Sequence, residues 1–156
     1  MTDYKKILIA VDLDGEPEQV LAKALSLVNS SADISIFNAA FDSSYSYASY
    51  ADTGGLFKET SATVKDKAKI KALQKLKLLI KKTDLQTANC IVEFGHAADE
   101  IIKKSDALDA ELIIIGSHGR HGVSLLLGST ANAVLHHAKC DVLAVRISNE
   151  KNKPNQ

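Results

Sequence analysis

Residues 110–130 read AELIIIGSHGRHGVSLLLGST, an apolar run that enters a glycine-rich turn. The run at 111–115 is continuous rather than alternating, which is typical of a strand covered on both faces. Gly116, Gly119 and Gly122 follow it, and glycines let backbone amides approach an anion closely. The helix predicted to begin near Ser129 directs free amides and partial positive charge to the same place. The stretch therefore predicts a strand–turn–helix unit with a candidate phosphate-binding turn.

The turn matches neither of the two best-known phosphate-binding motifs. No Gly-Lys-Ser/Thr ends it, and its glycine spacing does not form the dinucleotide fingerprint. An NTPase mechanism therefore lacks its main support. Arg120 supplies a second positive charge within the turn. Tight strand-to-helix connections also use glycines for conformational reasons, so a turn without a ligand stays open as an alternative.

Strands and helices alternate along the rest of the chain. The sequence predicts strands at 5–12, 32–41, 90–94, 111–115 and 141–147, and helices at 18–29, 64–82, 97–108 and from about 129 onward. The hydroxyls of Ser129 and Thr130 are predicted to cap the last helix. This alternation is typical of an α/β fold with a parallel sheet and helices on both faces. We expect one domain, residues 1–148, and a polar tail, residues 149–156.

Composition and charge narrow the functional classes. The chain has 156 residues, of which 46% are hydrophobic, enough for one core without disulfides or metals. Its 19 basic and 19 acidic side chains cancel, which disfavours a nucleic-acid partner. The basic pair at 5–6 is followed by only five apolar residues before Asp12, too few for a signal peptide or a membrane span, so we expect a cytoplasmic protein without membrane insertion. Cys90 and Cys140 are predicted to be buried, reduced thiols.

Two segments depart from the alternation. Residues 42–55 are rich in serine and tyrosine and read as a long loop, which could be a lid carrying Tyr45, Tyr47 and Tyr50 or a connection without a role. Residues 64–82 contain eight lysines in nineteen positions. A helical wheel predicts a solvated lysine face and a core-facing apolar face. The predicted apolar face consists of Ala68, Ala72, Leu73, Leu76, Leu79 and Ile80.

The histidines do not indicate a metal or a catalytic triad. His118 and His121 flank Gly119, and His136 and His137 are adjacent. No cysteine joins them at a metal-ligand spacing, so we predict no metal site. No serine, histidine and carboxylate set can be assembled with any specificity, which disfavours a hydrolase triad and a catalytic role.

Four separated blocks resemble the bacterial universal stress protein family, in the right order. They are KKILIAVD at 5–12, GHAADEII at 95–102, IIIGSHGRHG at 113–122 and LLLGSTANAVLHHAKCDVLAVR at 125–146. The resemblance covers residues 5–147. It implies a single three-layer α/β/α domain, of the adenine-nucleotide alpha-hydrolase-like kind, with five parallel strands in the order 3-2-1-4-5. Strands one and four would then meet at the topological switch point, which places Asp12 across a crevice from Gly116.

The resemblance also implies a ligand and its contacts. The ligand is ATP, or AMP or ADP, with Mg²⁺ accompanying ATP. Ala10, Asp12 and Ala39 match adenosine contacts, and Ile115, Gly116, Gly119, Gly128, Ser129 and Thr130 match ribose and phosphate contacts. We expect His118 and Arg120 to face phosphate or a partner subunit. A solvated strand-end carboxylate without a ligand is the alternative for Asp12.

The expected function is a stress-response regulator or adaptor that binds an adenine nucleotide and acts by conformation and partner binding. Only eight residues separate Gly119 from Gly128, one fewer than in the ATP-binding pattern of the family. This shortening favours the first alternative, a dimeric adaptor of the same fold without nucleotide. A slow ATPase and an enzyme of the adenylate-forming α/β families are less favoured. The resemblance further implies a homodimer through the last strand, Asp141 to Ile147, and an unidentified protein partner.

Overall fold

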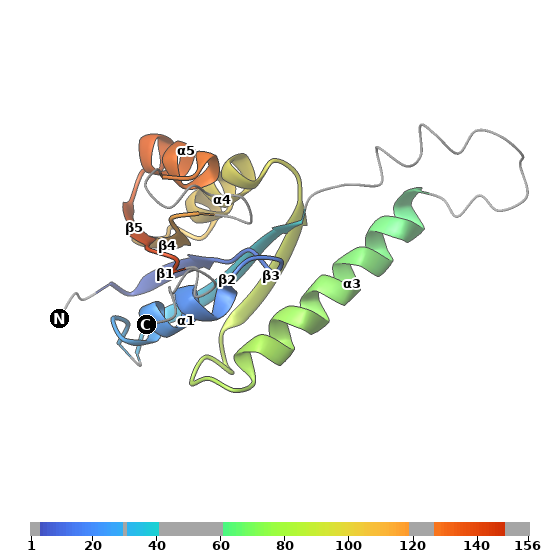
Figure 1. Ribbon diagram of the computed structural model, residues 1–156, viewed down its shortest axis with the longest axis horizontal. Helices are drawn as coiled ribbons and strands as arrows, with labels where there is room; N and C mark the ends of the chain where they lie inside the picture. The colour runs from blue at the N-terminus through green and yellow to red at the C-terminus, as the bar shows by residue number, and fades with distance from the viewer. Residues whose placement is uncertain (1–3, 30, 41–60, 119–126, 149–156) are drawn as a thin grey trace, which may run out of the picture.

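The computed structural model describes residues 4–29, 31–40, 61–118 and 127–148, and within them strands and helices alternate along the chain (Figure 1). The strands are β1 (Lys6–Ala10), β2 (Asp33–Ala40), β3 (Asn89–Phe94), β4 (Leu112–Gly116) and β5 (Asp141–Val145). The helices are α1 (Pro17–Leu25), α3 (Ser61–Ile80), α4 (Ala97–Ala107) and α5 (Ser129–His137). The predicted elements are therefore confirmed, with ends that differ by a few residues.

The strands form one parallel sheet in the order β3-β2-β1-β4-β5, which confirms the predicted fold class. The central strand β1 pairs on one side with β2 and on the other with β4. Ile9, for example, lies opposite Ile36 of β2 and Ile114 of β4. The chain thus winds outward in both directions from β1, so the strand order reverses between β1 and β4.

Helices cover both faces of the sheet, as the continuous apolar strands predicted. Alternate strand residues point to opposite faces, so Ile9 packs toward α1 and α3, whereas Leu8 packs toward α4 and α5. Both side chains are 0% exposed. The core therefore consists of two apolar layers separated by the sheet.

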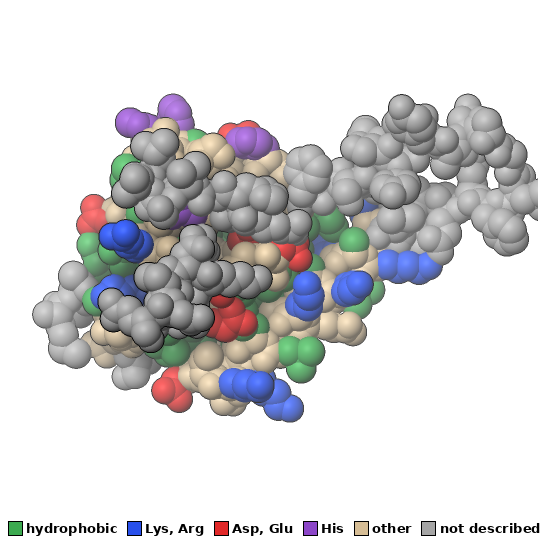
Figure 2. All heavy atoms as spheres, in the orientation of Figure 1, with side chains coloured by type: hydrophobic (Ala, Val, Ile, Leu, Met, Phe, Trp, Pro, Cys, Tyr) green, Lys and Arg blue, Asp and Glu red, His purple; other side chains and the backbone are tan. Residues whose placement is uncertain are grey.

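The apolar packing of α3 against the sheet comes from its second half. Leu76 and Ile80 are buried there, but Ala68 is exposed, so the predicted apolar face was wrong at its N-terminal end. Figure 1 shows the reason, because the first turns of α3 extend beyond the end of the sheet. Basic side chains follow the outer surface of this helix (Figure 2).

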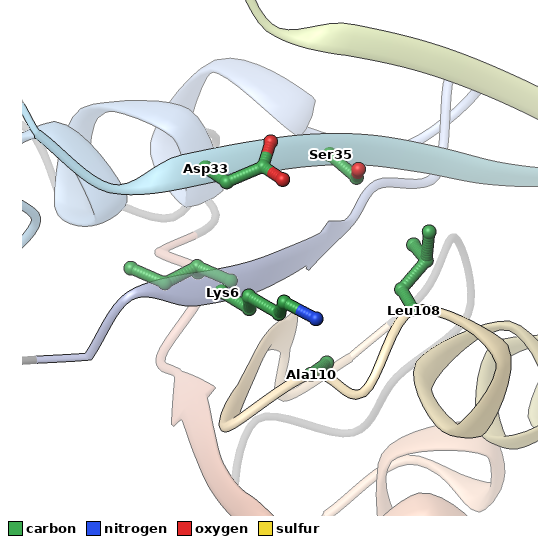
Figure 3. A pocket seen from close by; sticks show the side chains of 6 residues that line it. Lys6, Asp33, Ser35, Leu108 and Ala110 are labelled. Carbon is green, nitrogen blue, oxygen red and sulfur yellow. The ribbon is translucent and has the colours of Figure 1, made fainter.

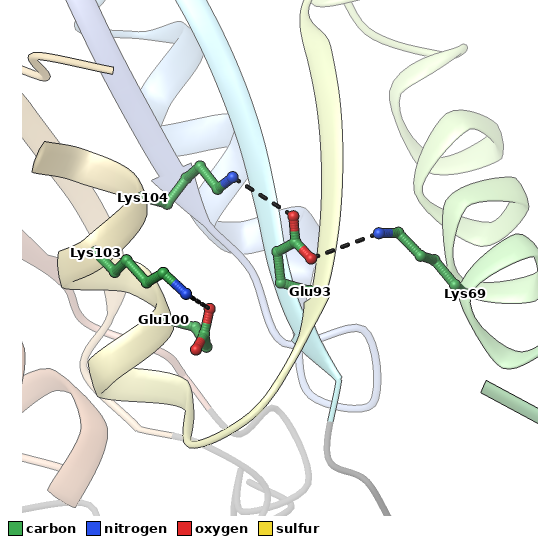
Figure 4. Close-up of polar contacts among 5 residues, drawn as sticks. All are labelled: Lys69, Glu93, Glu100, Lys103 and Lys104. Atoms are coloured by element: carbon green, nitrogen blue, oxygen red, sulfur yellow. Dashed lines mark hydrogen bonds and ion pairs between the residues drawn. The ribbon is translucent and has the colours of Figure 1, made fainter. Parts of the chain in front are cut away.

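An ion-pair cluster holds α3 and α4 against β3. Glu93 lies 3.5 Å from Lys69 of α3 and 3.5 Å from Lys104 of α4 (Figure 4). All three side chains are partly exposed, so each pair contributes little by itself. No helix within the described residues is long and apolar enough to cross a membrane.

The last strand is shorter than predicted, and its edge is organised differently. The strand predicted at 141–147 ends at Val145, which is 7% exposed, and Ile147 packs against the core. The amide of Asp141 donates to the carbonyl of Glu111, and the carbonyl of Val145 accepts from Ser117. Backbone groups alternate along a parallel strand, so those of residues 142 and 144 face the free edge.

The two cysteines are less enclosed than predicted. Cys90 and Cys140 are half-buried rather than buried, because each lies at the start of an outer strand or just before it. Burial raises the pKa of both thiols, and the neighbouring Asp141 carboxylate adds to the effect at Cys140. Both groups are therefore held as thiols rather than as reactive thiolates.

Some sequence predictions lie outside the described residues. They concern the candidate lid with Tyr45, Tyr47 and Tyr50, the turn residues Gly119, Arg120, His121 and Gly122, and the tail at 149–156.

Candidate functional site

The candidate site lies where β1 and β4 end side by side. Ala10 is opposite Ile115, and both side chains are at most 5% exposed. Ala10 is also opposite Phe37 of β2, and Ala39 lies two residues later, near the carboxyl end of β2. The structure thus brings together the residues predicted to contact adenosine at the carboxyl ends of three adjacent strands. Open α/β sheets bind ligands at such a reversal of strand order.

Asp12 lies two residues after the end of β1 and is exposed at this end of the sheet. Its Oδ1 accepts a hydrogen bond from the amide of Asp14 at 3.0 Å, and its carbonyl accepts one from Gly15 at 3.1 Å. A Cβ on Gly15 would lie 3.2 Å from Oδ2 of Asp12, so glycine leaves room beside the carboxylate. The turn fixes the carboxylate through one oxygen and leaves Oδ2 able to accept from a ligand hydroxyl.

Gly116 ends β4 at a point of close packing. A Cβ at this position would lie 3.3 Å from Cγ2 of Val20 and 3.4 Å from two side-chain carbons of Ile147. The absence of a side chain therefore lets α1 and the segment after β5 approach the end of β4. Glycine at this position serves close packing at the carboxyl end of β4.

Ser117 connects three parts of the site, and the sequence analysis did not single it out. Its amide donates to the carbonyl of Val145, and its carbonyl accepts from the amide of Gly128, both at 2.7 Å. The backbone of one residue thus fixes β5 and the start of α5 relative to the end of β4. Main-chain bonds of this kind leave no signal in the residue type.

The N-terminus of α5 lies at the same end of the sheet, beside the carboxyl end of β4. Gly128 is the N-cap residue, with φ −62° and ψ 155°, and no side-chain hydrogen bond caps the helix. The predicted capping by Ser129 and Thr130 was therefore wrong, because Ser129 is already the first helical residue. Among the described residues no side chain caps the first amides of α5, and a helix N-terminus attracts anions.

Two polar side chains complete the surroundings. Asn38 is buried and donates from Nδ2 to the carbonyl of Val11 at 3.0 Å, which satisfies the backbone where β1 ends. The sequence analysis missed it, because an asparagine within an apolar strand gives no sign of its partner. His118 lies with Nδ1 2.7 Å from Oγ of Ser117. Its Nε2 is buried and has no hydrogen-bond partner among the described residues.

Most of the predicted site residues thus gather at the carboxyl ends of the strands. They are Ala10, Asp12, Ala39, Ile115, Gly116, His118, Gly128, Ser129 and Thr130. Gly119 and Arg120 lie outside the described residues. In the described part of the chain, no group of three or more histidine, cysteine or acidic side chains is placed to hold a metal ion.

A small cavity lies at the opposite end of the sheet, where the strands begin. It has a volume of about 20 Å³ and is lined by side chains that include Lys6, Asp33, Ser35, Leu108 and Ala110 (Figure 3). Lys6 and Asp33 are the first residues of β1 and β2, so the cavity opens at the amino ends of the strands. Its volume suits about one water molecule and is far too small for a nucleotide.

Comparison with known proteins identifies the family. The sequence pattern of the universal stress protein family matches residues 3–146. Universal stress protein A homolog 2 of Coxiella burnetii is 40% identical over 150 residues, which cover 94% of this chain and 98% of that protein. The structure of universal stress protein UspA from Lactobacillus plantarum has the same fold, with a TM-score of 0.68 and 18% identity over 94% of this chain and all of that one.

A further solved structure has the same fold and contains a ligand. It is a universal stress protein in complex with cAMP, with a TM-score of 0.58 and 21% identity over 94% of this chain and 100% of that one. The family pattern, the closely related full-length sequence and the shared fold agree over almost the whole chain. This chain therefore belongs to the universal stress protein family.

Proposed function

We propose that this protein binds an adenine nucleotide at the carboxyl ends of β1 and β4 and acts as a regulator or adaptor. The observation that carries the proposal is the bond from the amide of Gly128 to the carbonyl of Ser117. It ties the N-terminus of α5 to the end of β4, at the reversal of strand order. A positive helix end is thereby held beside the crevice in which α/β sheets bind ligands.

The chemistry of the residues fits such a ligand. The exposed carboxylate of Asp12 suits ribose hydroxyls because each of its oxygens accepts hydrogen bonds. The first amides of α5 and the unpartnered Nε2 of His118 suit phosphate oxygens, which accept hydrogen bonds and carry negative charge. Donors and acceptors are thus distributed as a nucleotide requires, with the hydroxyl side at β1 and the phosphate side at β4.

The solved relative in complex with cAMP supports an adenine nucleotide as the ligand class. Among adenine nucleotides we favour ATP, with AMP and ADP as alternatives, and Mg²⁺ would arrive with the phosphates of ATP. Gly119 and Arg120 would join the phosphate contacts, as the family resemblance implies. The nucleotide would act by changing conformation and partner binding.

We do not expect appreciable turnover. The sequence has no P-loop lysine, and no residue in it is identifiable as one that orients an attacking water. Phosphoryl transfer is ordinarily stabilised by such groups, so a slow ATPase is the less favoured alternative. The second alternative is an adaptor without nucleotide, which the shortened spacing between Gly119 and Gly128 favours.

Replacing Asp12 tests the adenosine side of the site. Asp12→Ala is expected to weaken ATP binding about five- to tenfold, the effect of losing one net hydrogen bond of about 1–1.5 kcal/mol from an exposed group. Isothermal titration calorimetry measures the change. Asp14→Ala is the matched control, because Asp14 belongs to the same turn but pairs with Lys75 at 3.6 Å. Equal affinities for the parent and Asp12→Ala would remove Asp12 from the site.

We also propose that two copies pair antiparallel through the free edge of β5. The backbone groups of residue 144 face this edge, and the edge needs to be covered. Two-fold pairing through the same strand would satisfy both copies. A proline at Val145 would not test this pairing, because the carbonyl of Val145 accepts from Ser117, so the backbone groups of Val145 face β4 rather than the free edge.

Ala144→Pro is expected to convert the dimer into a folded monomer, because proline removes a donor from the paired edge. Sedimentation velocity at tens of micromolar measures the change, and Ala144→Thr, which keeps the amide, serves as the control. A parent that is already monomeric, or a folded proline variant that stays fully dimeric, would show that β5 is not the interface.

A further inference from the structure

Ser117 links the amide of Ile147 to the ring of His118, and this contact bears on which nitrogen of His118 carries the proton. The amide of Ile147 donates to Oγ of Ser117 over 3.4 Å, and Oγ lies 2.7 Å from Nδ1 of His118. A hydroxyl has a single proton to donate. The Ser117 oxygen could also accept from an Nδ1–H, but the hydroxyl proton would then have no acceptor among the described residues, so donation from Ser117 to Nδ1 is the favoured arrangement.

The direction of this bond has a chemical consequence at the other side of the ring. When Nδ1 of a neutral imidazole accepts, Nε2 carries the hydrogen and is a donor. Nε2 of His118 is buried and lacks a partner among the described residues. A buried donor without a partner costs free energy, which an acceptor on a ligand would recover. The hydrogen-bond chain therefore selects a ligand group that accepts, and excludes one that donates.

The surroundings specify what kind of acceptor this is. His118 follows Ser117, whose carbonyl holds the N-cap residue of α5, Gly128, at 2.7 Å. The positive N-terminal end of α5 therefore lies at the same end of the sheet as the imidazole of His118. An anionic acceptor is favoured there over a neutral one. Phosphate oxygens meet both conditions.

We propose that His118 is the residue that distinguishes a phosphorylated nucleotide from a free nucleoside at this site, and that Ser117 positions it by fixing the Nε2–H tautomer. The inference rests on the proposed function, because it concerns the same adenine-nucleotide site. His118 would touch the ligand, whereas Ser117 would act through His118. The adenosine side of the site, around Asp12, would be unaffected by either residue.

The tautomer can be measured without any nucleotide. Long-range ¹H–¹⁵N correlation spectra of the ¹⁵N-labelled protein at about pH 8.5, well above the ordinary pKa of an imidazole, distinguish the two neutral tautomers. We expect Nε2–H for His118, assigned by its loss from the spectrum of His118→Gln. Ser117→Ala should give a mixture of tautomers, while its backbone bonds to Val145 and Gly128 remain. An Nδ1–H tautomer in the parent, or an unchanged tautomer in Ser117→Ala, would overturn the chain of bonds.

The phosphate contact is tested with AMP and adenosine by calorimetry. The amide nitrogen of glutamine can occupy the place of Nε2, whereas asparagine reaches only as far as Nδ1, so the two variants form a matched pair. We expect His118→Asn to weaken AMP binding about tenfold and His118→Gln to change it less than about threefold. Adenosine should bind all three proteins equally, and thermal unfolding should show that all three are folded.

Each contrary result has a distinct meaning. Equal AMP affinities for the parent and His118→Asn, or a loss that is as large for adenosine as for AMP, would overturn the role of His118 while leaving the nucleotide site in place. A parent that binds neither compound would overturn the proposed function, and with it the phosphate contact.

Discussion

Ile114→Ala is expected to lower the free energy of unfolding by about 2–5 kcal/mol. Ile114 lies in the middle of β4, with β1 on one side and β5 on the other, and its side chain is 0% exposed. Removing three carbons there leaves a cavity in the apolar layer beneath α1 and α3, because paired strands on both sides prevent collapse. Urea unfolding measures the change. An unchanged slope of the free energy of unfolding against urea concentration would show that the two proteins expose the same surface on unfolding.

The same substitution at Ile70 is the matched control. Ile70 lies on the outward surface of α3 and is 55% exposed, so Ile70→Ala should change the stability by no more than about 0.5 kcal/mol. Equal losses at the two positions would contradict the assignment of the core.

Gly116→Val is expected to lower the stability by about 1–3 kcal/mol and to weaken adenine-nucleotide binding by at least about tenfold. The first added carbon alone would lie 3.3 Å from Val20 and 3.4 Å from Ile147. Valine adds two more methyl groups, so α1 or the segment after β5 has to move away from the end of β4. That movement would disturb Ser117, whose Oγ accepts from the amide of Ile147. Urea unfolding and equilibrium dialysis measure the two effects.

A second substitution checks the cause. Val20→Ala removes the methyl group nearest to the added Cβ, so the double variant should lose less stability than the sum of the two single losses. Additive losses would show that crowding against Val20 is not the reason.

The sheet could be predicted because its signal is local. Continuous apolar runs such as 7–11 and 112–115 are typical of strands buried on both faces, and the structure places them at the centre of the sheet. The positions that were wrong depend on where other elements end. Ala68 continues the apolar period of α3, yet it is exposed because the first turns of the helix extend beyond the end of the sheet. The strand predicted at 141–147 ends at Val145, and Ile147 instead packs against the core beside the end of β4.

The candidate site could be predicted only in part, for a similar reason. Asp12 and Gly116 lie at or just after the carboxyl ends of their strands, so parallel packing was enough to place them at the same end of the sheet. The bonds made by Ser117 and Asn38 depend on three-dimensional register and on main-chain groups, about which residue types say nothing. The family resemblance supplied the ligand class, and the structure adds the bonds that connect the phosphate side of the site to β5.

The central claim is that the crevice between β1 and β4 holds an adenine nucleotide. The most direct test dialyses the protein to equilibrium against equal concentrations of ATP and GTP, denatures it and measures the released nucleotides by mass spectrometry. This measurement also detects any nucleotide that was already bound during purification. The account predicts adenine nucleotide at about one molecule per chain and much less guanine nucleotide. Retention of neither nucleotide above its concentration in the buffer, or of both equally, would contradict it.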